Sequence, residues 1–193
     1  MLKQALIIGL AFGAFAAANA VTIATHQDPA LNGSTPLFFV TPGANGSVTG
    51  SWIGNGLTLD VPVVSQSFNN VKMQMNSVTK TGNTLGAGSV VFYTTNVANP
   101  LFQIDFNSAT IFQPFGLGGS YIEGNNVTFS GSAVNGLQFQ NAQFAFSFAN
   151  PVQTPNGNTY TASFTSSADV VPEPATMAVA GLALAALAKR KRK

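Results

Sequence analysis

Apolar and polar residues alternate along most of the chain between residues 21 and 171. Successive side chains of a β-strand point to opposite faces, so this period of two predicts strands with one apolar and one polar face. The alternation is clearest in residues 57–63, 71–76, 102–106, 144–148 and 160–164. The same region lacks the 3.6-residue period of an amphipathic helix. The pattern therefore predicts an all-β domain of antiparallel strands.

Asn-Gly pairs interrupt the alternating segments. Asn and Gly tolerate the positive φ angles that tight hairpin turns require. The pairs that begin at Asn135 and Asn156 each lie between apolar runs, so they predict hairpins. Short strands separated by regular turn signals are typical of a β-sandwich or barrel. We expect a single antiparallel β-sandwich or jelly-roll-like domain over residues 21–167.

The apolar positions change phase within one predicted strand. Leu137 and Phe139 share one phase, whereas the phenylalanines of residues 144–148 share the other. An extra residue in one strand of an antiparallel pair changes the phase without ending the strand. We therefore expect a β-bulge or a break near Asn141.

Residues 1–20 have the three parts of a secretory signal peptide. Lys3 supplies the positive charge, residues 5–17 form an uninterrupted apolar stretch, and Ala18-Asn19-Ala20 has the small-x-small form that signal peptidase accepts. A buried N-terminal helix would explain the apolar stretch but not the order of the three parts. We expect signal peptidase to recognise Ala18 and Ala20, and the mature chain to begin near Val21.

The chain ends in a second segment directed to a membrane. Val171-Pro172-Glu173-Pro174 precedes an apolar run over residues 175–188, and five basic residues follow. As a helix the run would be about 21 Å long, shorter than a bilayer core of about 30 Å. It predicts a short transmembrane helix that anchors the chain transiently in the inner membrane, with the basic end in the cytoplasm and the body in the periplasm. The prolines favour an extended backbone before it.

This combination of motif, apolar helix and basic terminus resembles the PEP-CTERM sorting domain of Gram-negative bacteria, and we assign residues 168–193 to it. The resemblance implies that an exosortase recognises Pro172, Glu173 and Pro174 and cleaves near them. It also implies release or transfer to the cell surface, and an association with exopolysaccharide and biofilm production. The alternative is a proline-containing linker before an ordinary tail anchor.

Charged residues make up 7% of the chain and are unevenly distributed. Between residues 21 and 171 only Lys72 and Lys80 are basic, against five carboxylates, so the body is net negative. The positive net charge belongs to the tail and gives no reason to expect nucleic-acid binding. The absence of cysteine excludes disulfides and thiol chemistry.

Few side chains of the body could carry catalysis or bind a metal. The single histidine, His26, is expected to be exposed near the mature N-terminus. Asp60, Asp105 and Glu123 could serve a polysaccharide-active hydrolase if two of them met at about 5–10 Å, or could bind Ca²⁺. The simpler interpretation is that they are solvated surface charges. We expect no catalytic residue, no metal ligand and no cofactor.

Two further features concern binding rather than chemistry. Aromatic rings can stack on sugars, but the aromatic residues with a polar atom, Trp52, Tyr93, Tyr121 and Tyr160, are better explained as core. Residues 138–150 combine β-propensity with no charge and no proline, a pattern typical of self-assembling segments and also of buried strands. We therefore expect a non-enzymatic surface or extracellular-matrix protein. A carbohydrate-binding module for exopolysaccharide is the first alternative, and a secreted hydrolase the second.

Overall fold

The computed structural model describes residues 20–30, 35–113, 115–120 and 126–171. The predicted signal peptide up to residue 19 and the predicted tail helix over residues 175–188 therefore lie outside the described residues. Within the described ranges, no helix has the length and apolarity needed to cross a membrane.

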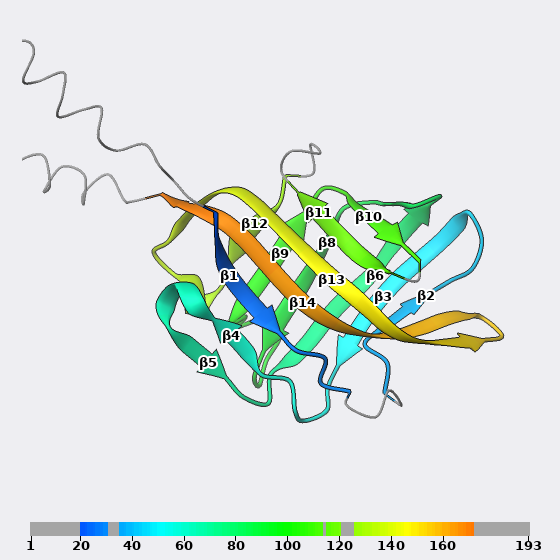
Figure 1. The fold of residues 1–193 in the computed structure, drawn as a ribbon, viewed down its shortest axis with the longest axis horizontal. Coiled ribbons are helices and arrows are strands. Elements are labelled where there is room, and N and C mark those ends of the chain that lie inside the picture. Colours follow the sequence, from blue (N-terminus) through cyan, green and yellow to red (C-terminus); the bar gives the residue numbers. More distant parts are fainter. Residues whose placement is uncertain (1–19, 31–34, 114, 121–125, 172–193) are drawn as a thin grey trace, which may run out of the picture.

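Fourteen strands and two short 3₁₀ turns make up the described part of the chain, arranged as Figure 1 shows. The first half contains β1 (Ala20–His26), β2 (Phe38–Val40), β3 (Asn45–Trp52), β4 (Leu59–Val61), η1 (Pro62–Val64), β5 (Gln66–Phe68), β6 (Lys72–Thr81), β7 (Thr84–Leu85) and β8 (Gly88–Tyr93). The second half contains β9 (Phe102–Phe106), β10 (Ala109–Phe112), β11 (Gly116–Ser120), β12 (Thr128–Ser130), η2 (Ser132–Val134), β13 (Gln138–Thr154) and β14 (Gly157–Val171). The all-β prediction is confirmed.

The strands form one sheet that closes on itself, not the two separate sheets of the expected sandwich or jelly roll. Eight antiparallel strands pair in a closed ring, in the order β6, β3, β2, β14, β13, β11, β10 and β7, and so make a barrel. Alternation along a strand reports an inner and an outer face, and both architectures have these. The pattern of apolar residues therefore could not distinguish them.

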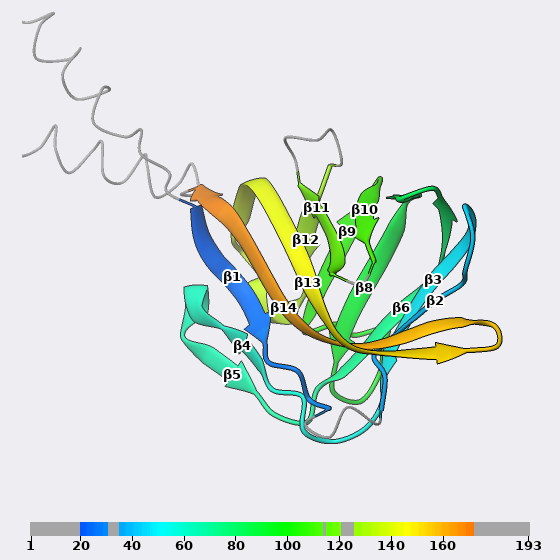
Figure 2. The same cartoon turned by 45° about the vertical axis from the view of Figure 1, so that its right-hand side comes forward.

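Two arms extend the ring because its longest strands change neighbours along their length. The first half of β6 pairs with β8, which continues to β9 and β12. The second half of β14 pairs with β1, which continues to β4 and β5. Figure 2 shows β13 and β14 running side by side across the molecule and projecting beyond it at their turn.

Phenylalanine fills the core. The rings of Phe146 and Phe164 lie 4.9 Å apart, and Phe38 lies 5.0 Å from Phe146. Phe92 lies 5.2 Å from Phe164, which joins the β8 arm to the last strand. Aromatic pairs at these distances stabilise a fold beyond the area that they bury. The abundance of phenylalanine thus serves the core.

Two bulges bend the β13–β14 pair. The register shifts between Gln140 and Gln143 and again between Ala149 and Val152. An asparagine with positive φ lies at each shift, Asn141 at 53° and Asn150 at 49°. Asparagine adopts this left-handed conformation more readily than most residues. The bulge predicted near Asn141 is therefore confirmed.

The two predicted hairpins have different outcomes. Thr154 pairs with Gly157 across a two-residue turn, which confirms the hairpin at Asn156-Gly157. The Asn135-Gly136 pair instead follows η2 and leads into β13, so the prediction of a hairpin there is wrong. The strand before it, β12, pairs with β9 and not with β13. An Asn-Gly pair thus indicates a tight turn but does not determine which strands pair.

Candidate functional site

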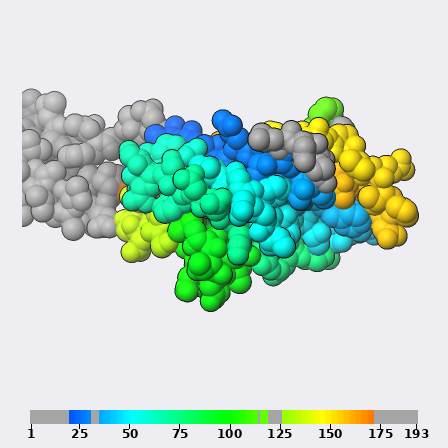
Figure 3. Space-filling model, turned by 90° about the horizontal axis from the view of Figure 1, so that it is seen from below, coloured from blue at the N-terminus to red at the C-terminus, as the bar shows by residue number. Residues whose placement is uncertain are grey.

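The two ends of the described chain lie side by side. Ala20, the residue expected before the signal-peptidase cut, pairs with Asp169 across β1 and β14, and Val21 pairs with Ala168. Strand β14 ends at Val171, the first residue of the Val-Pro-Glu-Pro motif. Ala18 and residues 172–174 lie outside the described residues. Figures 1 and 3 show the start of β1 and the tip of the β13–β14 hairpin at opposite ends of the long axis.

The candidate carboxylates come from different arms of the sheet. Asp60 lies on β4 and accepts a hydrogen bond from Ser67 Oγ at 2.5 Å. Asp105 lies on β9, where both of its oxygens are 2.9 Å from Gln103 Nε2. Glu123 lies outside the described residues. In the described ranges, no group of three or more His, Asp or Glu side chains is placed to hold a metal ion.

His26 is buried, so the prediction that it is exposed is wrong. Its side chain is 2% exposed and lies among Phe92, Phe146 and Phe164, with the Phe164 ring stacked at 5.6 Å. Its Nδ1 lies 2.8 Å from the Gln27 carbonyl oxygen, so Nδ1 carries the proton and donates. Burial lowers the pKa of His26, although the Gln27 hydrogen bond and Asp28 act in the opposite direction. A neutral core histidine results.

The aromatic residues considered for sugar stacking are used mainly for packing. Trp52 and Tyr160 are 6% and 2% exposed, and the Tyr160 ring stacks on Phe148 at 4.8 Å. The Tyr160 hydroxyl accepts a hydrogen bond from Gln113 Nε2 at 3.2 Å. Tyr93 is half-buried at the end of β8, and Tyr121 lies outside the described residues.

The uncharged segment over residues 138–150 belongs to β13, a strand inside the sheet. It pairs with β14, and its residues 143–147 also pair with β11. The buried-strand interpretation is therefore confirmed for residues 143–147. Beyond Phe148, β13 pairs on one side only, with β14 in the projecting hairpin.

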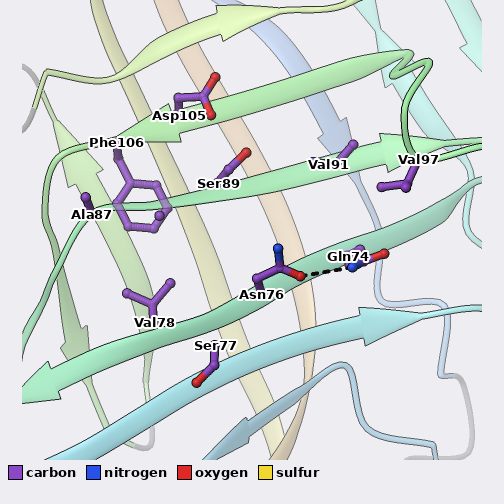
Figure 4. A pocket seen from close by; sticks show the side chains of 11 residues that line it. Gln74, Asn76, Ser77, Val78, Ala87, Ser89, Val91, Val97, Asp105 and Phe106 are labelled. Atoms are coloured by element: carbon purple, nitrogen blue, oxygen red, sulfur yellow. Dashed lines mark hydrogen bonds between the residues drawn. The ribbon is translucent and has the colours of Figure 1, made fainter.

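A depression of about 400 Å³, lined by both polar and apolar side chains, lies on the outer face of β6, β8 and β9. Asn76, Ser89 and Asp105 come from these three adjacent strands, and Figure 4 shows them in line across the sheet. Gln74 donates a hydrogen bond from Nε2 to Asn76 Oδ1 at 3.0 Å. Val91 and Val97 add apolar surface at one end, and Val78, Ala87 and Phe106 add it at the other. Asp105 is the single charged residue among the described residues that line the depression.

The pairing of β8 and β9 fixes the central part of this depression. Ser89 pairs directly with Asp105, and Asp105 pairs with Thr128 of β12. The Ser89 Oγ is buried and has no hydrogen-bond partner among the described residues. Sequence reasoning identified Asp105 as a candidate but missed Ser89 and Asn76. A serine or asparagine on a polar strand face carries no distinguishing signal until the strand register is known.

A second depression, of about 530 Å³, lies on β10, β11 and β13. Phe112 and Phe115, which are 57% and 76% exposed, flank it. Between them and β13 the surface is formed by Gly116 and Gly118. A Cβ on Gly116 would approach the Phe146 carbonyl oxygen to 2.0 Å, so the close strand approach requires glycine there. Exposed aromatic rings dominate this depression, whereas the depression at Asp105 has a carboxylate among its lining residues.

The described β domain ends where the proline-containing motif begins, with its first strand paired to its last. The chain is a PEP-CTERM domain-containing protein: residues 170–193 match the family model described as the PEP-CTERM protein-sorting motif. The motif implies export, transient anchoring at the C-terminus and processing by an exosortase. The match leaves the β domain uncovered. Comparison with curated proteins and with solved structures finds no match to the chain.

Proposed function

We propose that the processed protein is a non-catalytic component of the cell surface or extracellular matrix that associates with exopolysaccharide. The observation that carries this proposal is the direct connection of β14 to the sorting motif, which begins within the last two residues of that strand. Release of the tail would therefore deliver the β domain as the product. In this proposal the domain passes through the periplasm, anchored in the inner membrane, before it reaches the surface.

The surface chemistry of the domain supports association with an uncharged polymer. The outer faces carry mainly Asn, Gln, Ser and Thr side chains, which both donate to and accept hydrogen bonds from hydroxyl groups. Formal charges are few, so long-range attraction to a charged polymer contributes little. A carbohydrate-binding role is favoured over self-assembly because residues 143–147 of the aggregation-prone segment are paired on both sides.

Co-sedimentation with exopolysaccharide from the producing cell tests the association. The secreted protein should pellet with the polymer and remain soluble without it. Bovine serum albumin at the same concentration provides the control for trapping. Recovery of the secreted protein in the supernatant at high polymer concentration would contradict the proposal.

The hydrolase alternative has less support. Asp60 and Asp105 each have their own hydrogen-bond partner and lie on arms that extend from different strands of the ring. A glycosidase would need two carboxyl groups facing one substrate bond. If the secreted protein released sugars from exopolysaccharide, and the triple variant with Asp60→Asn, Asp105→Asn and Glu123→Gln did not, the chain would be an enzyme.

A further inference from the structure

The depression on β6, β8 and β9 gathers hydrogen-bonding groups of complementary kinds. Ser89 lies directly opposite Asp105 in the β8–β9 register. Side chains opposite each other on one face have Cβ atoms about 4.5–5.5 Å apart. Asn76 follows two residues after Gln74, which pairs with Val91, so it lies beside Ser89 on the next strand. A carboxylate, a hydroxyl and an amide therefore share one concave surface (Figure 4).

The Ser89 hydroxyl is the first feature that indicates a binding site in the depression. Its Oγ is buried but has no hydrogen-bond partner among the described residues. Buried polar atoms in native proteins are nearly always paired, because an unpaired one loses its hydration without compensation. Nearby, Asn76 Oδ1 accepts from Gln74 Nε2, a bond that leaves the Asn76 amide nitrogen available to donate. The rest of the Ser89 residue is only partly buried and lines the depression, so rotation of its hydroxyl toward the depression would let a ligand group supply the missing partner.

The Asp105 carboxylate is held in place by its own strand. Gln103 Nε2 lies 2.9 Å from each carboxylate oxygen, which fixes the orientation of the group. A carboxylate has about four acceptor positions, so acceptor capacity remains for a ligand. Two adjacent hydroxyl groups of a sugar can each donate to one carboxylate oxygen. Preorganised groups of this kind reduce the entropy lost on binding.

The lining favours a neutral sugar over an ion. A Ca²⁺ ion takes six to eight oxygen ligands with several carboxylates, and the described residues here include one. An amine would pair with Asp105 but would leave the Ser89 and Asn76 groups poorly matched. Sugar hydroxyls donate and accept, as Ser89 and Asn76 do. Val91 and Val97, the latter 40% exposed, offer apolar surface for the C–H face of a sugar ring.

We propose that the depression formed by Asn76, Ser89 and Asp105 binds neutral saccharide units of a polysaccharide through adjacent hydroxyl groups. This proposal rests on the proposed association with exopolysaccharide, and it assigns that association to one site. Asp105 accepts from the hydroxyl pair, and Ser89 exchanges a hydrogen bond with the same sugar. The depression at Phe112 and Phe115 is not part of this site.

Matched variants of the secreted protein test the site. Asp105→Ala should weaken co-sedimentation with exopolysaccharide at least tenfold, and Ser89→Ala by a smaller factor. Asp60→Ala is the control, because Asp60 is also a strand carboxylate with a hydroxyl partner but lies on β4 outside the depression. Asp60→Ala should bind as the unchanged protein does. Equal binding by the Asp105 and Asp60 variants would overturn the proposal.

Titration with single sugars separates the ligand classes. In ¹H–¹⁵N NMR spectra, at least one of glucose, galactose and mannose should shift the amides of Ser89 and Asp105, and Asp105→Ala should remove these shifts. Shifts with glucosamine alone would indicate an amine site, and shifts with glucuronate alone would indicate an anion site; either result would overturn the proposal.

If the unchanged protein does not pellet with exopolysaccharide, the proposed function itself fails. If it pellets and the Asp105 variant does too, only the site assignment fails.

Discussion

Ala20 pairs with Asp169, so the first residue of β1 lies beside the last residue of β14 before the sorting motif at residues 170–193. The residue that signal peptidase should recognise is thus also a strand residue of the folded domain. A peptidase needs an extended, unpaired segment at its active site. We therefore expect removal of the signal peptide to precede the docking of the first residues of β1 onto β14.

Processing at both ends can be read from the mass of the secreted protein. Its N-terminus should be Val21, and the basic residues 189–193 should be absent. Replacing Glu173 with Ala should leave the tail attached, because the residue lies in the recognition motif. Asp60→Ala, on β4 and outside the sorting domain, is the control and should be processed normally. A surface-located chain that still ends in Lys193 would contradict the processing step.

Strand β1 should contribute strongly to stability although it begins at the cleavage point. Ile23 is 0% exposed, whereas Val21 is 39% exposed. Ile23→Ala should lower the free energy of unfolding by about 2–5 kcal/mol, the usual range for an aliphatic side chain deleted from a core. Val21→Ala on the same strand should cost much less. Urea denaturation of the two variants measures the difference, and equal losses would show that β1 is not docked in solution.

The bulge at Asn141 should depend on both its backbone conformation and its side chain. Asn141 has a φ of 53°, and its Nδ2 donates to Asp169 Oδ2 at 2.7 Å. Asn141→Ala should destabilise the domain by about 1–2 kcal/mol, because it loses the hydrogen bond and strains the left-handed conformation. Asn141→Gly loses the hydrogen bond and gains freedom in the unfolded chain, but it adopts the left-handed conformation without strain, so it should be the milder variant. Thermal unfolding compares the pair, and a milder effect of alanine would exclude this explanation.

The buried histidine should make the fold sensitive to mild acid. Burial lowers the pKa of His26, so below its ordinary value of about 6.5 the unfolded state binds the proton more readily than the folded state. Its contribution to stability is therefore fully present above pH 6.5 and decreases as the pH falls toward the lowered pKa. Urea midpoints at pH 7.5 and pH 5 should differ.

The matched variant for this prediction is His26→Leu, which has a similar volume and no titratable group. Its urea midpoint should change less between pH 7.5 and pH 5 than that of the unchanged protein. A pH dependence identical in both proteins would assign the effect to other groups.

The strands were predictable from sequence because alternation reports burial directly. The segment over residues 102–106 became β9 with its apolar residues inside, and the phase change at Asn141 became a bulge. Closure of the sheet could not be predicted, because it depends on strands such as β14 that change partners along their length. The burial of His26 could not be predicted from alternation, because a register shift between Thr22 and Thr25 breaks the period of two in β1 and turns Ala24 and His26 toward the core.

The depression at Asp105 was partly predictable. Asp105 is conspicuous because carboxylates are scarce in this chain, and its outward direction follows from the alternation around Phe106. Ser89 and Asn76 gain meaning only from the register that places them beside Asp105. Sequence therefore supplied the charged member of the site, and the pairing of β6, β8 and β9 supplied the other two.

Because β14 is the last strand to be synthesised, the barrel can be completed only at the end of synthesis. This last strand pairs with β13, β1 and β2, and Ser166 Oγ accepts from the Ala24 amide across 142 residues of sequence. The barrel therefore cannot close until the final strand has been made and moved across the membrane. The sorting motif follows that strand at once. A chain whose synthesis stops before β14 lacks both the closing strand and the sorting motif. Recognition of the motif therefore selects molecules in which every strand of the barrel has been made.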